Sequence, residues 1–237
     1  MADKIVSEFR SFLNFANDGF KYNLQVFPDT ITAGALLFAL LFQSPQMGAL
    51  GGSLALLNFI HPAFAGFLGT HLQNVVEPSP DTGACTGFFP GVSYERLLGA
   101  VQSKSMGSIA PAWPSFYSVF LGFLGGWVGL LPYLYKRELD ASARRKAAAT
   151  TGVVILSIVI LLCAVYRLNS GCDKFTGLAL GMIVGAGLGV VLCGFLSSIT
   201  DRRITNIMNM PLIRERVPDG KPIYVCERPS AAGKKTN

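Results

Sequence analysis

Long stretches of the chain carry no Asp, Glu, Lys or Arg, and the charges are concentrated between them. The four uncharged stretches are residues 30–76, 105–135, 147–166 and 175–200, more than half of the 237 residues. A membrane-spanning helix needs about 20 predominantly apolar residues. The last three stretches therefore predict one spanning helix each, near 115–135, 149–167 and 175–197.

The first uncharged stretch is too long for a single span. A helix from residue 31 to 71 would be about 60 Å long at about 1.5 Å per residue, twice the hydrocarbon thickness of a bilayer. Polar residues and a proline at 43–46 interrupt it. We expect a hairpin, with a short first segment near 29–43 and a longer one near 47–70. The pattern predicts an all-α integral membrane protein with about five transmembrane helices. The alternative is four, with the first segment re-entrant or partly surrounded by protein.

The predicted elements divide the chain into five parts. In residues 1–28, apolar residues recur at helical spacing between charges, which predicts an amphipathic helix. It would lie on the membrane surface, on a partner, or on the rest of its own chain. The other parts are the membrane hairpin 29–71, a Pro/Gly-rich ordered loop 72–114 on the non-cytosolic face, three transmembrane helices in 115–200 with a basic loop at 136–146, and a polar C-terminal tail 201–237.

Composition and charge narrow the classes of function. Charged residues make up 14% of the chain and hydrophobic residues 51%, whereas soluble domains carry about 25% charged residues. The net charge of +6 is concentrated in loop 136–146, at +3, and in the tail from 201 onward, at +4. Basic residues in short loops stay on the cytoplasmic side. The surplus therefore marks a membrane face and not a nucleic-acid site, and the composition argues against a soluble enzyme.

The five cysteines differ in their predicted surroundings. Cys163 and Cys193 lie inside spans, where cysteine behaves as a small apolar residue. Cys85 and Cys172 are the two in polar loops on the non-cytosolic face. A disulfide between them would tie the long loop to the turn between the last two spans, in an oxidising compartment; the alternative is two unpaired thiols. No CxxC motif or paired Cys/His cluster indicates a metal site.

Glycines recur four residues apart in the last span and again in the span at 115–135. Such glycines share one face of a helix and let two helix backbones approach closely. The partner helix could belong to the same chain or to another. The predicted packing positions are Gly177, Gly181, Gly185 and Gly189 in the last span, and Gly122 and Gly126 in the earlier one.

No catalytic signature appears among the motifs. GxSxG and HExxH are absent, and no charged residue lies in the centre of a span, which argues against ion-coupled transport. His61 precedes Pro62, and we expect a hydrogen-bonded histidine at a kink; a proton relay or a haem ligand at His61 or His71 is the alternative. We expect no catalytic residue, metal, cofactor or small-molecule substrate.

Two groups of residues in the polar segments are candidates for contact with partner proteins. Trp113 and Phe116 belong to an aromatic collar where the span at 115–135 begins, and such aromatics anchor at membrane interfaces. Ile223, Tyr224 and Val225 follow a turn and predict a short strand, which must pair with a neighbouring segment because an isolated strand is unstable.

Several short segments carry a family resemblance: CTGFF at 85–89, WPSFY at 113–117, Cys172, and the segments 206–211 and 219–225. Together they resemble polytopic membrane proteins of large icosahedral DNA viruses with an internal membrane, such as phycodnaviruses. The resemblance covers roughly residues 80–226. It implies a virion membrane protein that lies under the capsid and contacts minor capsid proteins, and it carries over no catalytic residues.

The leading hypothesis is a structural, non-enzymatic protein of a large membrane assembly, most simply the internal membrane of a virion. Its partners would be the lipid bilayer and minor capsid proteins. One alternative is a channel or transporter subunit, which predicts a polar pore at the interface of the glycine-rich spans. Another is an accessory subunit of a respiratory or photosynthetic complex, which predicts cofactor contacts from His61 or His71.

Overall fold

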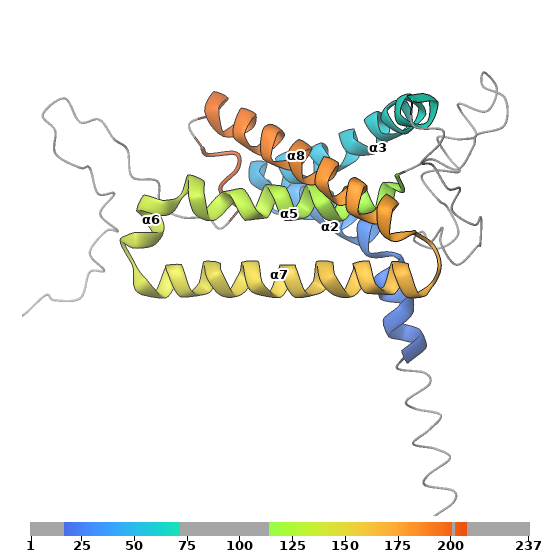
Figure 1. Ribbon diagram of the computed structural model, residues 1–237. Helices are drawn as coiled ribbons and strands as arrows, with labels where there is room; N and C mark the ends of the chain where they lie inside the picture. Colours follow the sequence, from blue (N-terminus) through green and yellow to red (C-terminus); the bar gives the residue numbers. More distant parts are fainter. Residues whose placement is uncertain (1–16, 72–113, 201, 208–237) are drawn as a thin grey trace, which may run out of the picture.

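The computed structural model describes residues 17–71, 114–200 and 202–207, and every regular element in these ranges is an α helix (Figure 1). A helix at Asn17–Gln25 precedes the labelled elements. These are α2 (Phe27–Leu41), α3 (Pro45–His71), α5 (Phe116–Leu134), α6 (Lys136–Asp140), α7 (Ala143–Asn169) and α8 (Phe175–Ile199).

Local sequence signals set several helix ends. The Ser115 side chain caps α5 by accepting a hydrogen bond from the backbone N–H of Ser118 at 3.3 Å, which satisfies an otherwise unpaired donor. The α7 helix ends at Asn169, and Gly171 follows two residues later with a φ of +67°. Glycine adopts this conformation without a steric penalty. The N–H of Cys172 then reaches the carbonyl of Arg167 at 3.1 Å, the pattern of a Schellman cap.

The α5 helix is the centre of the bundle. It contacts each of the other labelled helices, most extensively α8, and its large side chains are among the most buried of the described residues. The buried set on α5 includes Phe120, Phe123, Leu124, Trp127 and Leu131. Figure 1 shows α7 running along one side of α5 while α8 crosses α5 at a shallow angle.

The α5–α8 interface is built on backbone-to-backbone contact. A Cβ atom added at Gly185 of α8 would overlap the carbonyl oxygen of Val119, and one added at Gly126 of α5 would overlap that of Ala186. Two helices can approach this closely only where the side chain is a hydrogen. The same holds at Gly122 and Gly189, whereas a Cβ atom added at Gly181 would overlap the Ser118 side chain. Gly177 is buried as well. The partner of the α8 glycines is therefore a helix of the same chain.

Among the described residues, four helices are long and apolar enough to cross a membrane: α3 over Pro45–Ala65, α5, α7 and α8. They correspond to the predicted spans near 47–70, 115–135, 149–167 and 175–197. The α2 helix has 15 residues, about 22 Å at about 1.5 Å per residue. It reaches the length of a fifth span only together with Asn17–Gln25, to which it is joined at a 66° bend. The short first segment of the predicted hairpin is therefore half of a broken element.

The described charges lie at the two ends of the bundle. We call one the basic end: it holds seven exposed Lys and Arg side chains and two acidic residues. The basic residues are Lys136, Arg137, Arg144, Arg145, Lys146, Arg202 and Arg203. Arg202 reaches the carbonyl of Leu134 at 3.1 Å, so the two basic segments meet at one end, as the alternation of spans predicts.

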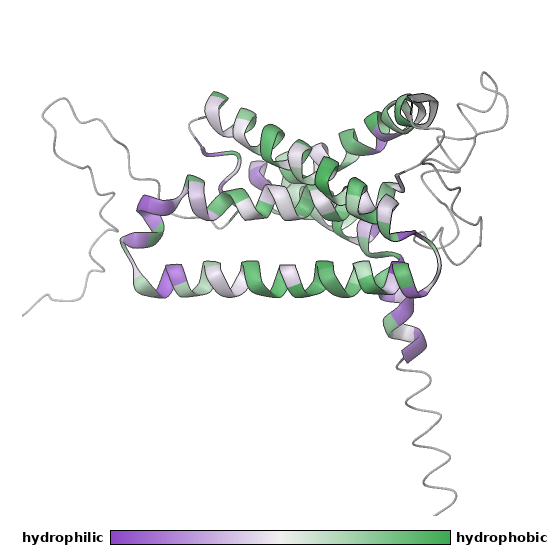
Figure 2. Cartoon of the chain, in the orientation of Figure 1, coloured by the Kyte–Doolittle hydropathy of each residue, from purple (hydrophilic) through white to green (hydrophobic). Residues whose placement is uncertain are grey.

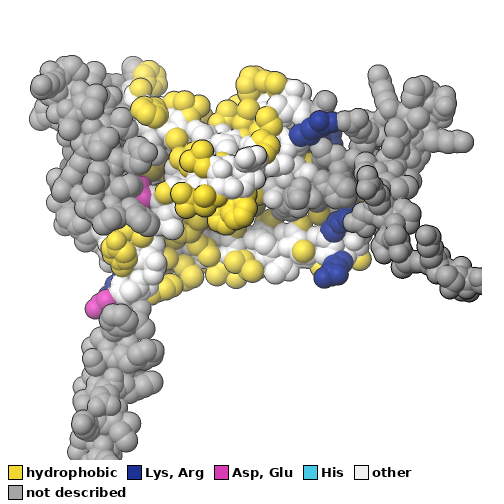
Figure 3. Space-filling model, turned by 180° about the vertical axis from the view of Figure 1, so that it is seen from behind, with side chains coloured by type: hydrophobic (Ala, Val, Ile, Leu, Met, Phe, Trp, Pro, Cys, Tyr) yellow, Lys and Arg dark blue, Asp and Glu magenta, His cyan; other side chains and the backbone are white. Residues whose placement is uncertain are grey.

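The opposite end is electrically balanced and lies beyond an apolar middle. It holds three basic and three acidic described residues: Arg167, Lys174 and Lys21 against Asp173, Asp18 and Asp29. Figure 2 shows hydrophobic residues through the middle of α7 and hydrophilic ones near its start. Figure 3 shows Lys and Arg side chains gathered at one end of the molecule, with apolar side chains between the ends.

The connecting segments differ in how much of them the structure describes. The loop predicted at 136–146 contains the short helix α6 and the first turn of α7, so it is mostly helical. The ordered loop is described only from residue 114 and the tail only for 202–207. The predictions for 72–113 and for the rest of the tail lie outside the described residues.

Candidate functional site

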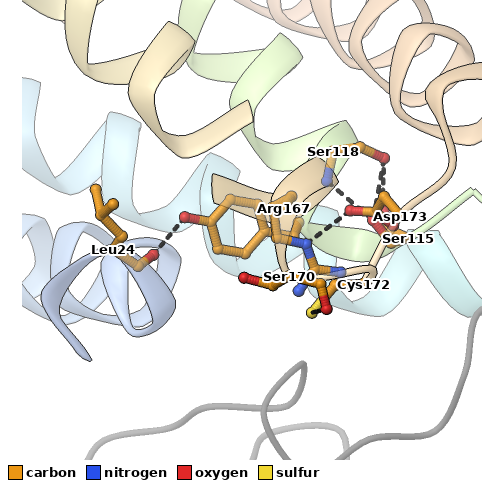
Figure 4. Close-up of polar contacts among 8 residues, drawn as sticks. Leu24, Ser115, Ser118, Arg167, Ser170, Cys172 and Asp173 are labelled. Atoms are coloured by element: carbon orange, nitrogen blue, oxygen red, sulfur yellow. Dashed lines mark hydrogen bonds and ion pairs between the residues drawn. The ribbon is translucent and has the colours of Figure 1, made fainter. Parts of the chain in front are cut away.

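The opposite end of the bundle holds a buried ion pair. Arg167, in the last turn of α7, donates from Nε to Oδ2 of Asp173 at 2.7 Å. The side chains are 6% and 3% exposed. The Schellman cap described above places both residues, because the backbone N–H of Asp173 also points at the Arg167 carbonyl at 3.4 Å. The ion pair therefore closes the turn between α7 and α8 (Figure 4).

Tyr117 connects this ion pair to the N-terminal helix. The guanidinium carbon of Arg167 lies 4.8 Å from the centroid of the Tyr117 ring, within the range of a cation–π interaction. The hydroxyl of Tyr117 donates to the carbonyl oxygen of Leu24 (Figure 4). One aromatic side chain at the start of α5 thus fixes the end of helix Asn17–Gln25 and covers the Arg167 charge.

His61 joins α3 to the same end. Its Nε2 lies 2.8 Å from the carbonyl oxygen of Pro114, and its ring meets Phe116 edge-on at 5.4 Å between centroids. His61 is buried and hydrogen-bonded, as the sequence predicts. The contact fixes the last part of α3 against the first turn of α5.

A second polar cluster lies at the basic end. The Tyr135 hydroxyl donates to the carbonyl oxygen of Arg202 and lies 2.9 Å from Oγ1 of Thr205. Burial raises the pKa of Tyr135 above its ordinary value, and the hydrogen bond with Thr205 opposes part of that rise. The phenol therefore stays protonated and keeps its donor in place. The cluster holds the segment that follows α8 against the end of α5.

Two carboxylates of α6 have contrasting surroundings. Asp140 is exposed and pairs with Lys146 at 2.9 Å, and this hydrogen bond lowers the pKa of Asp140. Glu138 is buried, and its Oε2 has no hydrogen-bond partner among the described residues. A buried carboxylate oxygen without a donor is unfavourable, so Glu138 is the least satisfied charged group of the basic end.

The candidate partner contacts fall in different places. Phe116 is half-buried and packs inside the chain against His61 and Phe120, so its described contacts are internal ones. The other candidates, Trp113, Ile223, Tyr224 and Val225, lie outside the described residues.

The structure describes one of the two cysteines of the predicted disulfide. Cys172 is fully buried beside the Arg167–Asp173 pair, and its Sγ lies 4.0 Å from the carbonyl oxygen of Ser170 (Figure 4). Cys85 lies outside the described residues, so the pairing stays a prediction. Cys163 and Cys193 are buried free thiols in α7 and α8.

Sequence reasoning missed the Arg167–Asp173–Tyr117 cluster. The signal was present: opposite charges flank a turn of a few residues between two apolar stretches, with a glycine between them. In chemical terms the cluster offers a fixed charge pair and a hydrogen-bonded phenol. Within the described ranges, no group of three or more His, Cys, Asp or Glu side chains is placed to hold a metal ion.

No family model matches the chain, and no curated protein or solved structure matches it.

Proposed function

We propose that this chain is a structural, non-catalytic integral membrane protein of a large assembly. Within that class, we propose that it is an inner-membrane protein of a virion that links the membrane to minor capsid proteins. The single observation that carries the membrane part is an apolar surface between two charged ends.

The exposed apolar side chains support a lipid environment. On α7 and α8 the large apolar residues facing outward include Leu161, Ile183 and Val191, which are 63%, 69% and 69% exposed. Contiguous apolar surface of this kind is unfavourable in water and marks a contact with a partner or with lipid. It lies between charged ends and on helices of membrane-spanning length, so a bilayer is the simplest environment that covers all of it.

The packing of the glycine-rich spans supports a structural role over a pore. The channel alternative requires a polar path between these spans. At Gly126 and Gly185 the space beside each glycine is filled by the backbone of the facing helix, and even a methyl group would overlap it. The polar clusters described above lie at the two ends of the bundle.

The virion part of the proposal is supported by the sequence resemblance alone. Of its segments, Ser115, Phe116 and Tyr117 lie at the start of α5, next to the buried cluster at the opposite end. The polar tail would provide contact surfaces beyond the basic end.

Two experiments test the two parts separately. Extraction of native membranes with alkaline carbonate should leave the protein in the pellet; release into the supernatant would contradict membrane insertion. Cross-linking of the native particle through Lys136, Lys146 and Lys174, followed by mass spectrometry, should identify capsid proteins as neighbours. Cross-links to redox or pore subunits would contradict the virion assignment, as would ion conductance of the purified protein in planar bilayers.

A further inference from the structure

An apolar groove runs between α3 and α8 near the basic end. It encloses about 350 Å³ and is open to the outside of the bundle. Its α3 wall covers residues 45–56, about three helical turns, and the segment after α8 closes one end. The lining residues are Pro45, Gly48, Ala49, Gly52, Ser53 and Leu56 of α3, Leu192 and Leu196 of α8, and Ile204.

Small residues of α3 create this groove. A Cβ atom placed on Gly52 would meet nothing within 4 Å, so the absence of a side chain there leaves empty space. The one hydroxyl in the wall, Ser53, already donates to the carbonyl of Ala49 at 2.6 Å. The groove therefore presents hydrocarbon surface, and a ligand that fills it must be apolar along its length.

Two arginines stand next to the groove in the sequence. Ile204, which lines the groove, directly follows Arg202 and Arg203. Both arginine side chains are exposed. Arg202 is held by its bond to the Leu134 carbonyl, while the Arg203 side chain makes no hydrogen bond or ion pair in the described part of the chain. Guanidinium groups bind phosphate oxygens through several parallel hydrogen bonds.

We propose that this groove binds one acyl chain of an anionic phospholipid, whose phosphate contacts Arg202 and Arg203. The proposal rests on the proposed membrane location. An apolar groove with a wall three turns long, lined by a residue that directly follows two exposed arginines, matches an anionic lipid in both shape and charge. Basic pockets between spanning helices on the cytoplasmic side recognise anionic headgroups in this way.

The test compares lipid binding by matched variants in detergent, measured by native mass spectrometry. The probes are phosphatidylglycerol and phosphatidylcholine with identical acyl chains. Two arginines near the phosphate should favour phosphatidylglycerol by about 30-fold. Gly52→Leu should abolish this binding because the new side chain fills the groove. Gly187→Leu is the control: Gly187 is also an exposed helical glycine with nothing within 4 Å of an added Cβ, but it lies outside the groove.

A second pair of variants tests the charge. Arg203→Gln should lower phosphatidylglycerol affinity by about fivefold and lower phosphatidylcholine affinity by less, because the cationic choline offsets the charge of the same phosphate. Arg144→Gln, an exposed basic residue at the same end, should change neither. Circular dichroism and the unfolding temperature should show that all four variants fold.

Three outcomes would overturn the lipid proposal. The first is wild-type phosphatidylglycerol binding by Gly52→Leu. The second is equal affinity for the two lipids in the wild-type protein. The third is a loss of dimers in Gly52→Leu without a change in lipid binding, which would assign the groove to a second copy. Carbonate extraction separates failure of the lipid proposal from failure of the proposed function. If the protein stays in the membrane pellet but shows no lipid preference, the lipid proposal fails and the proposed membrane location stands.

Discussion

Arg167 and Asp173 form a buried ion pair at the opposite end, and the Tyr117 ring lies against the guanidinium. Neither side chain is accessible to water to any useful extent. Bringing two charges out of water is unfavourable, and their attraction roughly offsets that loss when the geometry is good. Loss of one partner removes this attraction while the other side chain stays buried.

Asp173→Ala should therefore destabilise the protein strongly. We expect a loss of roughly 3 kcal/mol in the free energy of unfolding, because Arg167 stays buried and loses its 2.7 Å ion pair with the Asp173 carboxylate. Unfolding by SDS in mixed micelles, followed by circular dichroism, measures this change. Asp173→Asn should fall between the wild type and Asp173→Ala, since the amide oxygen still accepts a hydrogen bond.

Asp140→Ala is the matched control for this prediction. Asp140 also pairs with a basic residue, Lys146, at 2.9 Å, but both side chains are about half exposed or more. Exposed pairs contribute little because water already solvates both charges. We expect no measurable loss. Equal effects of the two substitutions would show that burial of the Arg167–Asp173 pair has no energetic consequence.

Individual residues differed in how well the sequence predicted their surroundings. The hydrogen-bonded His61 followed from its apolar context and the adjacent proline. The Arg167–Asp173 pair did not, because it depends on a cap at Gly171 that reverses the chain between two helices. The partner of Gly185 could not be named either, because periodicity defines a face of one helix and says nothing about the helix that covers it.

The contact between α5 and α8 is the most constrained feature at the level of whole elements. Glycine inside a helix is less favourable than alanine by about 1 kcal/mol, so an exchange to alanine should stabilise a helix wherever space allows. At Gly185 the space is taken by the α5 backbone. Close backbone contact also permits weak Cα–H···O hydrogen bonds between the helices.

Gly185→Ala should lower the stability of the bundle despite the better helix propensity of alanine. We expect a loss of about 1–3 kcal/mol, since the two helices must separate to admit the methyl group. The same SDS titration measures it, and a cross-link between engineered cysteines on α5 and α8 should form more slowly.

Gly187→Ala is the control two residues along the same helix. An added Cβ there meets nothing within 4 Å, so the variant should be as stable as the wild type or slightly more stable. Equal stability of Gly185→Ala and Gly187→Ala would contradict the close backbone contact between α5 and α8.

Elements were predictable where apolar length decides them. The uncharged stretches located α3, α5, α7 and α8 because the cost of burying charge in hydrocarbon is large. The predicted division at 28/29 lies close to the bend at Val26, where Pro28 stands in the first turn of α2. That the two helices together reach the length of one span was not visible in the sequence. The helix α6 was assigned to a loop because four of its five residues, KRELD, are charged.

The distribution of charge over the whole molecule predicts its orientation. Among the described residues, the basic end combines seven exposed cationic side chains with two acidic residues, whereas the opposite end has equal numbers of basic and acidic residues. Retention of basic loops on the cytoplasmic side then places α6 and the segment after α8 together, on the face away from the α7–α8 turn.

Labelling of single engineered cysteines with a membrane-impermeant maleimide tests this orientation. In a Cys226→Ser background, Ala141→Cys at the end of α6 and Arg203→Cys after α8 should react from the same side of sealed vesicles. Ser170→Cys, in the α7–α8 turn, should react from the other side. All three positions are exposed, so a cysteine that fails to react with the maleimide is shielded by the membrane and not buried in the protein. Ala141→Cys and Ser170→Cys reacting from one side would mean that α7 does not cross the bilayer, and the charge asymmetry would then need another explanation.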